Sequence, residues 1–241
     1  MLVKTIIQQE MLQQDELQGK AVVVIDVLRA SSSMVTALAN GAKAVMPAPD
    51  VQSACQLREK SNNSLLAGER NGCKIPGFEL GNSPLEYTKD RLKGKTLIMI
   101  TTNGTRALLA AQQAEQILAA SFLNSTAAAK MLLALELDVV LLCAGTKGRF
   151  SLEDFAAAGM LATALLELGA RVRLKDETLA AAALYEKYSG QLETMLCKAE
   201  HGHDLAINGF SRDLSFCAQK DIFDAVPRKQ EDGSFASGKY N

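Results

Sequence analysis

Three short apolar runs dominate the first part of the chain, and each is followed by a polar turn and then by a helical pattern. The runs cover residues 22–25, 96–100 and 139–143. They are continuous rather than alternating and too brief for helices, which is typical of strands covered on both faces of a parallel sheet. Helical patterns follow over residues 33–40, 105–116 and 152–168. Glycines close the first and the third of these patterns, in the C-cap role.

Weaker runs and later helical patterns extend this alternation along the chain. Further strand candidates cover residues 43–46, 65–67 and 171–174, and several helices are predicted between residues 179 and 219. Alternating strands and helices predict an α/β fold, layered α/β/α around a mainly parallel or mixed sheet. No Ser/Gly-rich or Pro-rich linker divides residues 1–241, so we expect a single α/β domain, with two tightly packed lobes as the alternative. The polar tail at 227–241 is expected to cross back over the core.

Four separated polar segments share one chemical character. They cover residues 26–33, 68–72, 101–106 and 145–154, and each combines hydroxyls, glycine or a guanidinium. At least three of them begin where an apolar run stops, and the carboxyl ends of parallel strands meet along one edge of a sheet. We therefore expect these loops to converge on a site for a small, highly charged anion and a divalent cation.

The third polar segment has the features of an anion-binding turn. It reads Thr101-Thr102-Asn103-Gly104-Thr105 and is followed by Arg106. A strand that leads through glycine into a helix start directs several backbone amides at one point, and phosphate is a common ligand there. The alternative is simple N-capping by Thr101 or Asn103. Neither the Walker nor the dinucleotide-binding glycine pattern is present, so a nucleotide site of those kinds is not indicated.

Carboxylates and guanidinium groups recur side by side in these segments. Asp26 lies within the end of an apolar strand, where an ionised carboxylate is costly unless it meets a cation or several donors. Arg29 could be its structural partner; alternatively, Asp26 binds a metal while Arg29 holds an anionic oxygen. Glu69 and Arg70 repeat the acid-then-base order within a glycine-bounded loop, which favours a functional role.

Asp154 has two interpretations. With Ser151 it has the spacing of a capping box, in which it would hold a helix N-terminus. It, or Glu153 beside it, could instead join Asp26 and Glu69 around a metal ion. Oxygen ligands with no nearby His or Cys favour Mg²⁺ over Zn²⁺.

Composition and charge narrow the class of protein. Formal net charge is -1, with 26 Lys+Arg against 27 Asp+Glu, so a nucleic-acid partner is not expected. No apolar stretch approaches the roughly 18 residues of a membrane span, and we expect a cytoplasmic protein with no membrane partner. The five cysteines are far apart and suggest neither disulfides nor zinc. His201 and His203 are a weak metal signal and are expected at the surface or at a helix cap; a histidine that entered the site could protonate a leaving oxygen.

At these motifs the sequence resembles the 2-phosphosulfolactate phosphatase family. The matching stretches are residues 24–32, 68–72 with Ile75, 77–78, 81–84, 101–105, 144–146, 150–154, 213–218 and 226–227. Several motifs in the right order, spread over nearly the whole chain, make the likeness specific. It implies an α/β enzyme that hydrolyses 2-phosphosulfolactate to sulfolactate and phosphate with Mg²⁺, a reaction of coenzyme M biosynthesis.

The motifs and the resemblance together suggest a set of site residues. We expect catalytic roles for Asp26, Arg29, Glu69 and Arg70, and metal ligation by Asp26, Glu69 and Asp154. We expect the substrate, a small and multiply anionic molecule, to contact Ser31, Ser32, Asn71, Asn82, Ser83, Thr101, Thr102, Asn103, Gly104, Thr105, Gly145, Thr146 and Arg149.

Two questions of mechanism and class stay open at this point. Water could attack phosphorus directly, or Asp26 could form a phosphoenzyme, because an aspartate at the end of a strand suits both roles. A lyase or isomerase acting on another small phosphorylated or sulfonated acid, or a non-catalytic anion-binding protein, would have a similar pocket. A homodimer is the expected assembly, since two-fold symmetry is the commonest arrangement.

Overall fold

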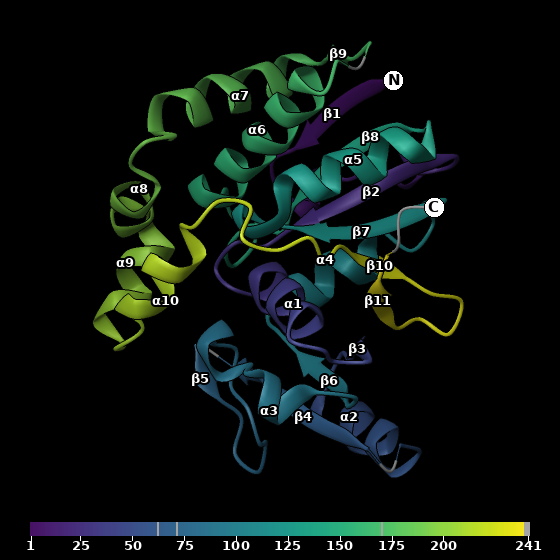
Figure 1. Cartoon of the computed structure of the whole chain (residues 1–241), viewed down its shortest axis with the longest axis vertical. Helices are drawn as coiled ribbons and strands as arrows, with labels where there is room; N and C mark the ends of the chain where they lie inside the picture. The colour runs from purple at the N-terminus through teal and green to yellow at the C-terminus, as the bar shows by residue number, and fades with distance from the viewer. Residues whose placement is uncertain (62, 71, 170, 239–241) are drawn as a thin grey trace.

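The computed structural model describes residues 1–61, 63–70, 72–169 and 171–238. Within them the chain forms an α/β fold around an 11-stranded mixed sheet of order β5-β4-β6-β3-β11-β10-β7-β2-β8-β1-β9 (Figure 1). The strands are β1 (Leu2–Ile6), β2 (Lys20–Ile25), β3 (Ala44–Pro47), β4 (Ser64–Arg70), β5 (Cys73–Lys74), β6 (Thr96–Ile100), β7 (Gln116–Ala120), β8 (Asp138–Cys143), β9 (Arg173–Leu174), β10 (Pro227–Lys229) and β11 (Phe235–Ser237). The α-helices are α1 (Ala30–Ala39), α2 (Val51–Glu59), α3 (Lys89–Leu92), α4 (Gly104–Ala110), α5 (Ser125–Leu135), α6 (Leu152–Glu167), α7 (Asp176–Tyr188), α8 (Leu192–Lys198), α9 (Glu200–Ile207) and α10 (Ser211–Cys217). The predicted layered α/β architecture is confirmed.

The sheet consists of two parallel groups of strands joined by an antiparallel hairpin. Strands β9, β1, β8, β2 and β7 are parallel to one another, and so are β3, β6 and β4. The hairpin β10–β11 lies between the groups and is held to each by a single residue pair, Arg228 with Leu118 and Phe235 with Val45. Three successive antiparallel pairings reverse the strand direction from one group to the other. The polar segments therefore do not share one edge of a single parallel sheet.

Helices α1 and α4 fill the space between the two strand groups (Figure 1). Val22 and Val24 of β2 face them from one side, and Leu97 of β6 faces them from the other, within one hydrophobic cluster. Helices α5 and α6 cover the opposite face of the β2 group, where Val23 packs. Because helices lie on both sides of β2, its apolar run is continuous, as the sequence pattern predicts.

Helix α1 is buried along its whole length except at Ala39, although it begins with three serines. Each serine hydroxyl donates to a backbone carbonyl: Ser31 to Val24, Ser32 to Val27 and Ser33 to Asn82. Buried hydroxyls are tolerated when they are hydrogen-bonded, so these contacts allow a polar helix start to pack between the two strand groups.

Most predicted elements are present, and the main error lies after residue 110. The helical pattern predicted over 105–116 ends at Ala110, and β7 follows as a strand between β2 and β10. Its glutamine, leucine and alanines favour a helix, but pairing with two neighbouring strands overrides that local preference. The predicted helices between 179 and 219 are confirmed as parts of α7 to α10. The tail enters the sheet as β10 and β11 instead of only crossing the core, and the choice between one domain and two lobes stays a prediction.

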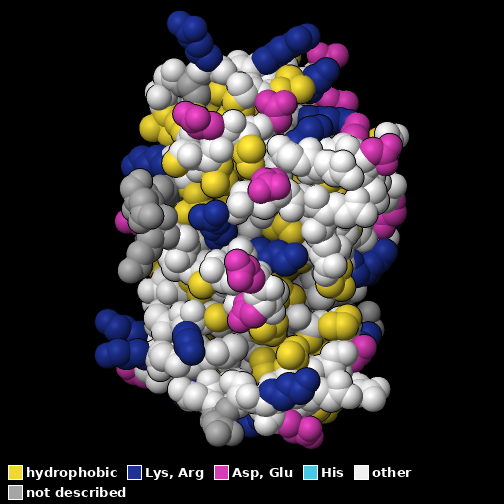
Figure 2. Space-filling model, turned by 90° about the vertical axis from the view of Figure 1, so that its right-hand side faces the viewer, with side chains coloured by type: hydrophobic (Ala, Val, Ile, Leu, Met, Phe, Trp, Pro, Cys, Tyr) yellow, Lys and Arg dark blue, Asp and Glu magenta, His cyan; other side chains and the backbone are white. Residues whose placement is uncertain are grey.

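The surface carries both signs of charge. Figure 2 shows Lys and Arg side chains interspersed with Asp and Glu on the face in view. None of the helices in the described ranges combines the length and the hydropathy that a membrane span requires.

Candidate functional site

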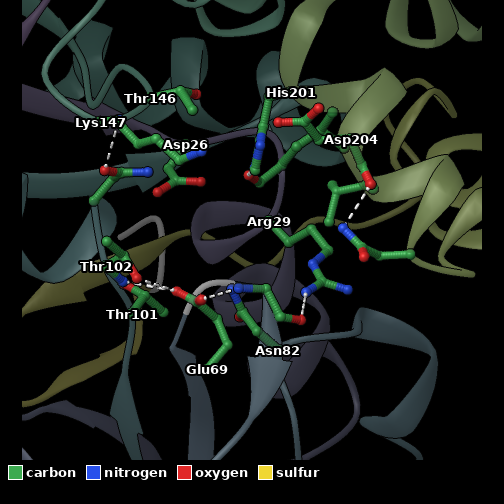
Figure 3. A pocket seen from close by; sticks show the side chains of 15 residues that line it. Asp26, Arg29, Glu69, Asn82, Thr101, Thr102, Thr146, Lys147, His201 and Asp204 are labelled. Carbon is green, nitrogen blue, oxygen red and sulfur yellow. Dashed lines mark hydrogen bonds between the residues drawn. The ribbon is translucent and has the colours of Figure 1, made fainter.

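A pocket of about 270 Å³ lies where the ends of β2, β4, β6 and β8 meet helix α9 (Figure 3). The predicted site residues that line it are Asp26, Arg29, Glu69, Asn82, Thr101, Thr102, Asn103 and Thr146. All four polar segments are thus represented, and the expected convergence is confirmed. It arises because the carboxyl ends of both strand groups approach the space around α1 and α4, not because all four strands are parallel neighbours.

Asp26 is placed by a tight turn between β2 and α1. Its backbone amide donates to Ser31 Oγ, and its Oδ1 accepts from the Ala30 amide at 3.0 Å, in the first turn of α1. Oδ2 accepts no hydrogen bond from the described part of the protein, so it is available to a ligand. Burial raises the pKa of Asp26 from 3.8 to about 6; the Ala30 amide and His201 oppose this rise, and the charges of Glu69 and Glu153 add to it.

Glu69 joins two neighbouring strands at the floor of the pocket. It lies at the end of β4, not in the loop that the sequence suggested. Its Oε1 accepts from both the amide and the hydroxyl of Thr102, each at 2.8 Å, and its Oε2 accepts from the Gly72 amide at 2.8 Å. These three hydrogen bonds fix the Glu69 side chain and the start of the 101–105 turn.

Asp154 positions the loops instead of capping its own helix. Its Oδ1 accepts from the Val27 amide at 2.8 Å and its Oδ2 from the Gly145 amide at 3.1 Å. The capping-box interpretation is wrong, because Ser151 makes no cap hydrogen bond and its hydroxyl has no partner within the described ranges. Burial raises the pKa of Asp154, with contributions from Glu153 and Asp26. Asp154 therefore joins the ends of β2 and β8 beneath the pocket.

Arg29 is paired with Asp213, not with Asp26. Its guanidinium donates to Asp213 at 2.7 Å, and both side chains are almost completely buried. It also donates to the Gly72 carbonyl at 3.3 Å and lies 4.1 Å from the centroid of the Phe210 ring. The structural pairing with Asp26, one of the two alternatives that the sequence left open, is not formed, because a carboxylate from α10, distant in sequence, occupies the favourable position.

The 101–105 turn packs closely against Asp26. Thr101 Oγ1 accepts from the Thr105 amide at 2.9 Å, so Thr101 has the capping role that the sequence offered as the alternative. A Cβ at Gly104 would lie 2.4 Å from Ala30 Cβ and 2.9 Å from Asp26 Oδ2. Only glycine allows this approach, which brings the start of α4 beside the carboxylate. Asn103 Oδ1 accepts from the Lys147 amide at 3.2 Å and links this turn to the loop after β8.

Several predicted contact residues lie beside the pocket and not in its lining. Their backbone or side-chain partners explain their positions. Ser31, Ser32, Ser83, Gly104, Thr105 and Gly145 are held by hydrogen bonds or close packing in the walls, whereas Arg149 pairs with Glu200 at the surface. Arg70 lines a neighbouring pocket of about 230 Å³ on the other side of Glu69 and Thr102. Asn71 lies outside the described residues.

Helix α9 supplies the side of the pocket that sequence reasoning missed. His201, Asp204, Leu205 and Asn208 line it, together with Leu28 and Lys147 from the predicted loops. The H-x-H pair at 201 and 203 was the available signal for this helix. The sequence predicts a position at the surface or at a helix cap; the surface position is correct for His203, whereas His201 is half-buried and its Nε2 lies 2.8 Å from the Leu28 carbonyl oxygen.

Comparison with known proteins places these residues in a family. The family model described as 2-phosphosulpholactate phosphatase matches residues 6–232. The chain belongs to this family. It is 45% identical over 210 residues to a probable 2-phosphosulfolactate phosphatase of Carboxydothermus hydrogenoformans, covering 87% of this chain and 86% of that protein. A protein of the same name from Clostridium novyi is 39% identical over 228 residues, covering 94% and 96%. The resemblance drawn from the motifs is confirmed, and the matched region includes both the four polar segments and α9.

For a member of this phosphatase family the charge balance of the pocket is unexpected. Its lining carries the carboxylates Asp26, Glu69 and Asp204 against the cations Arg29 and Lys147. The charge of Arg29 is already compensated by Asp213. A multiply charged anion would meet net repulsion here, so its binding calls for additional positive charge.

The oxygen atoms of the pocket fit one divalent cation that is bound partly by the protein and partly by the phosphate oxygens of a bound substrate. No group of three His, Cys, Asp or Glu side chains within the described ranges is arranged to enclose a metal ion. Mg²⁺ does not require such a cage, since it is commonly bound through one or two carboxylates, water and substrate phosphate oxygens. Asp26 Oδ2 offers one free carboxylate oxygen, and Glu69 lines the same pocket.

Proposed function

We propose that this protein hydrolyses 2-phosphosulfolactate to sulfolactate and inorganic phosphate in an Mg²⁺-dependent reaction. The observation that carries the proposal is the convergence of Asp26, Glu69, Asn103 and Thr146 on one pocket in a chain of the 2-phosphosulpholactate phosphatase family. These residues come from four separate strand ends. Such a site suits a three-carbon acid that carries phosphate, sulfonate and carboxylate.

In this proposal Asp26 and Glu69 hold Mg²⁺, and Asp154 acts through the loops that it positions. When bound, the ion supplies positive charge that offsets the phosphoryl oxygens in the transition state. The free Oδ2 of Asp26 and the placement of its Oδ1 at the α1 N-terminus support this assignment. The three hydrogen bonds to Glu69 hold its carboxyl group in place for the same purpose.

The chain's own residues bind and orient the substrate. The Arg29 guanidinium and the exposed Lys147 ammonium lie on different sides of the pocket, so they suit two different anionic groups of one molecule (Figure 3). Asn82 lines the same pocket and lies near Glu69 and Arg29 in the close view (Figure 3). Asp26 either orients the attacking water or accepts the phosphoryl group itself, since a carboxylate with one free oxygen serves both routes.

The deciding experiment measures inorganic phosphate released from 2-phosphosulfolactate by the purified protein. Release is expected with Mg²⁺ and is expected to stop when a chelator is added in excess. Release that persists in the chelator would refute the Mg²⁺ assignment. Consumption of the substrate without phosphate would favour a lyase or isomerase, and thermal stabilisation by the substrate without turnover would favour an anion-binding protein.

The same proposal includes a place in coenzyme M biosynthesis, a cytoplasmic location and a homodimer. The first follows from the reaction, because its product would be sulfolactate. Light scattering of the purified protein tests the assembly, for which a mass of twice 25.8 kDa is expected.

A further inference from the structure

His201 is held against the pocket by one directional contact. It lies in the first turn of α9, half-buried, and extends between Asp26 and Asp204 in the close view of the pocket (Figure 3). Its Nε2 is 2.8 Å from the Leu28 carbonyl oxygen. A carbonyl oxygen only accepts, so Nε2 carries a hydrogen whether the ring is neutral or charged. The proton that the ring can gain or lose therefore resides on Nδ1.

Close packing fixes the start of α9, and with it the histidine. A Cβ at Gly202 would lie 1.8 Å from the Leu196 carbonyl oxygen and 3.6 Å from a methyl group of Leu28. The helix thus approaches the preceding helix more closely than any larger residue would permit, and it is in ordinary packing contact with the 26–29 turn. The turn that contains Asp26 also accepts the His201 hydrogen bond, so the positions of the two side chains are fixed relative to each other.

Three other ionisable groups of the pocket, Arg29, Glu69 and Lys147, are poorly suited to give up a proton. Arg29 is always charged and is committed to Asp213. Glu69 accepts three hydrogen bonds, so both of its carboxyl oxygens are already engaged. Lys147 is exposed, with no side-chain contact that fixes it among the described residues. Histidine is the side chain that exchanges a proton most readily near neutral pH.

We propose that His201 protonates the ester oxygen as the phosphoryl group leaves, an inference that rests on the proposed function. The bond between phosphorus and the ester oxygen breaks, and its electron pair goes to that oxygen, which takes the proton from Nδ1. The oxygen of water forms the new bond to phosphorus. One proton of that water returns to Nδ1 through solvent, so the ring is restored and the products are the alcohol and phosphate.

This role has a clear chemical need. The leaving group is a secondary alcohol, whose alkoxide is a poor leaving group without a proton. A positioned acid contributes about 10²–10⁴-fold to the rate of such steps. The same transfer applies if Asp26 accepts the phosphoryl group, because the ester bond breaks in that route as well.

The test compares His201→Gln with His203→Gln. Glutamine can place its amide nitrogen near the position of Nε2 and keep the hydrogen bond to Leu28, but it cannot deliver a proton. We expect kcat for phosphate release to fall about 100-fold in His201→Gln with little change in KM. His203, two residues later and exposed on the same helix, should tolerate the same change without loss. Melting temperatures of both variants are measured alongside.

The outcomes separate this inference from the function on which it rests. Full activity in His201→Gln, with the unchanged protein active, would refute the proton donor and leave the phosphatase intact. No phosphate release by the unchanged protein would refute both. If His201→Gln lowers the melting temperature, His201→Ala with added imidazole decides: recovery of kcat is expected, and failure to recover would overturn the inference.

Discussion

Asp26 shows how one residue is made reactive by its surroundings. It directly follows the buried strand β2, its Oδ1 is held at the start of α1, and burial raises its pKa to about 6. An ionised carboxylate in this position is destabilising until a cation meets it. The ionised Asp26 therefore lowers the stability of the protein without the ion, while the same charge is needed to bind the proposed ion.

The first prediction concerns Asp26→Asn in the presence of a chelator. The carboxyl pKa is 3.8 in the unfolded chain and about 6 in the folded one, so the native state binds more protons between these values. Its stability therefore falls as pH rises from about 4 to 6 and then levels off. Asparagine removes this loss, which at about 1.4 kcal/mol per pKa unit amounts to about 3 kcal/mol at neutral pH.

Urea unfolding at several pH values measures this effect. The variant should be more stable than the unchanged protein at pH 7, and the two should converge near pH 4. Phosphate release should fall at least about 100-fold in the variant, comparable to the loss of a transition-state contact. Asp15→Asn, at an exposed carboxylate, is the control and should change neither quantity. An equal or lower stability of Asp26→Asn at pH 7 would contradict the argument.

Helix α10 lies outside the pocket but holds two of its neighbouring segments in place. Asp213 accepts from Arg29 on one oxygen and from the Ser83 hydroxyl on the other, each at 2.7 Å. These contacts join α10 to the start of α1 and to the loop before α3. Phe210, in the turn between α9 and α10, lies against the same guanidinium. Helix α10 and the turn that joins it to α9, the helix of His201, are therefore anchored to Arg29 in the turn that also contains Asp26.

Asp213→Asn tests this anchor. The variant leaves the buried Arg29 without its counter-charge, and breaking such a pair costs about 3–5 kcal/mol of folding free energy. Glu200→Gln removes an ion pair of similar length that is largely exposed, and should cost less than about 1 kcal/mol. Urea unfolding compares the two. Similar small losses in both variants would mean that the buried pair does not hold the helices together.

At the scale of the whole molecule, the C-terminal hairpin holds the two strand groups together. It pairs with β7 on one side and with β3 on the other. Phe235 of β11 is buried in the same cluster that contains residues of α1 and α4. The pocket lies between the two groups, so the hairpin stabilises the arrangement on which the pocket depends.

Phe235→Ala is expected to destabilise the whole protein. Truncating a buried phenylalanine costs about 3–5 kcal/mol. Leu179→Ala, at a half-exposed position on α7, should stay within about 1 kcal/mol. Thermal unfolding measures both, and the loss in Phe235→Ala should accompany a loss of phosphate release near the melting transition. A stable Phe235→Ala protein would show that the two groups hold together without the hairpin.

The sequence alone was sufficient to predict features that depend on residues close together in the chain. Continuous apolar runs such as that of β6 identified strands covered on both faces, because burial on two sides leaves no polar alternation. The polar residues at the ends of those runs, including Asp26 and Thr102, were found for the same reason: a strand end is a local feature. The motifs in these loops also carried the family resemblance.

Other features depend on parts of the chain that are far apart, and these required the folded molecule. β7 is a strand because two neighbours supply hydrogen bonds, although its own residues favour a helix. Arg29 pairs with Asp213 instead of nearby Asp26, and His201 meets Leu28 across 173 positions of sequence. The order of apolar and polar residues along the chain indicates which side chains are buried. Which distant groups meet is set by how the two strand groups close around α1 and α4, and no single segment contains that information.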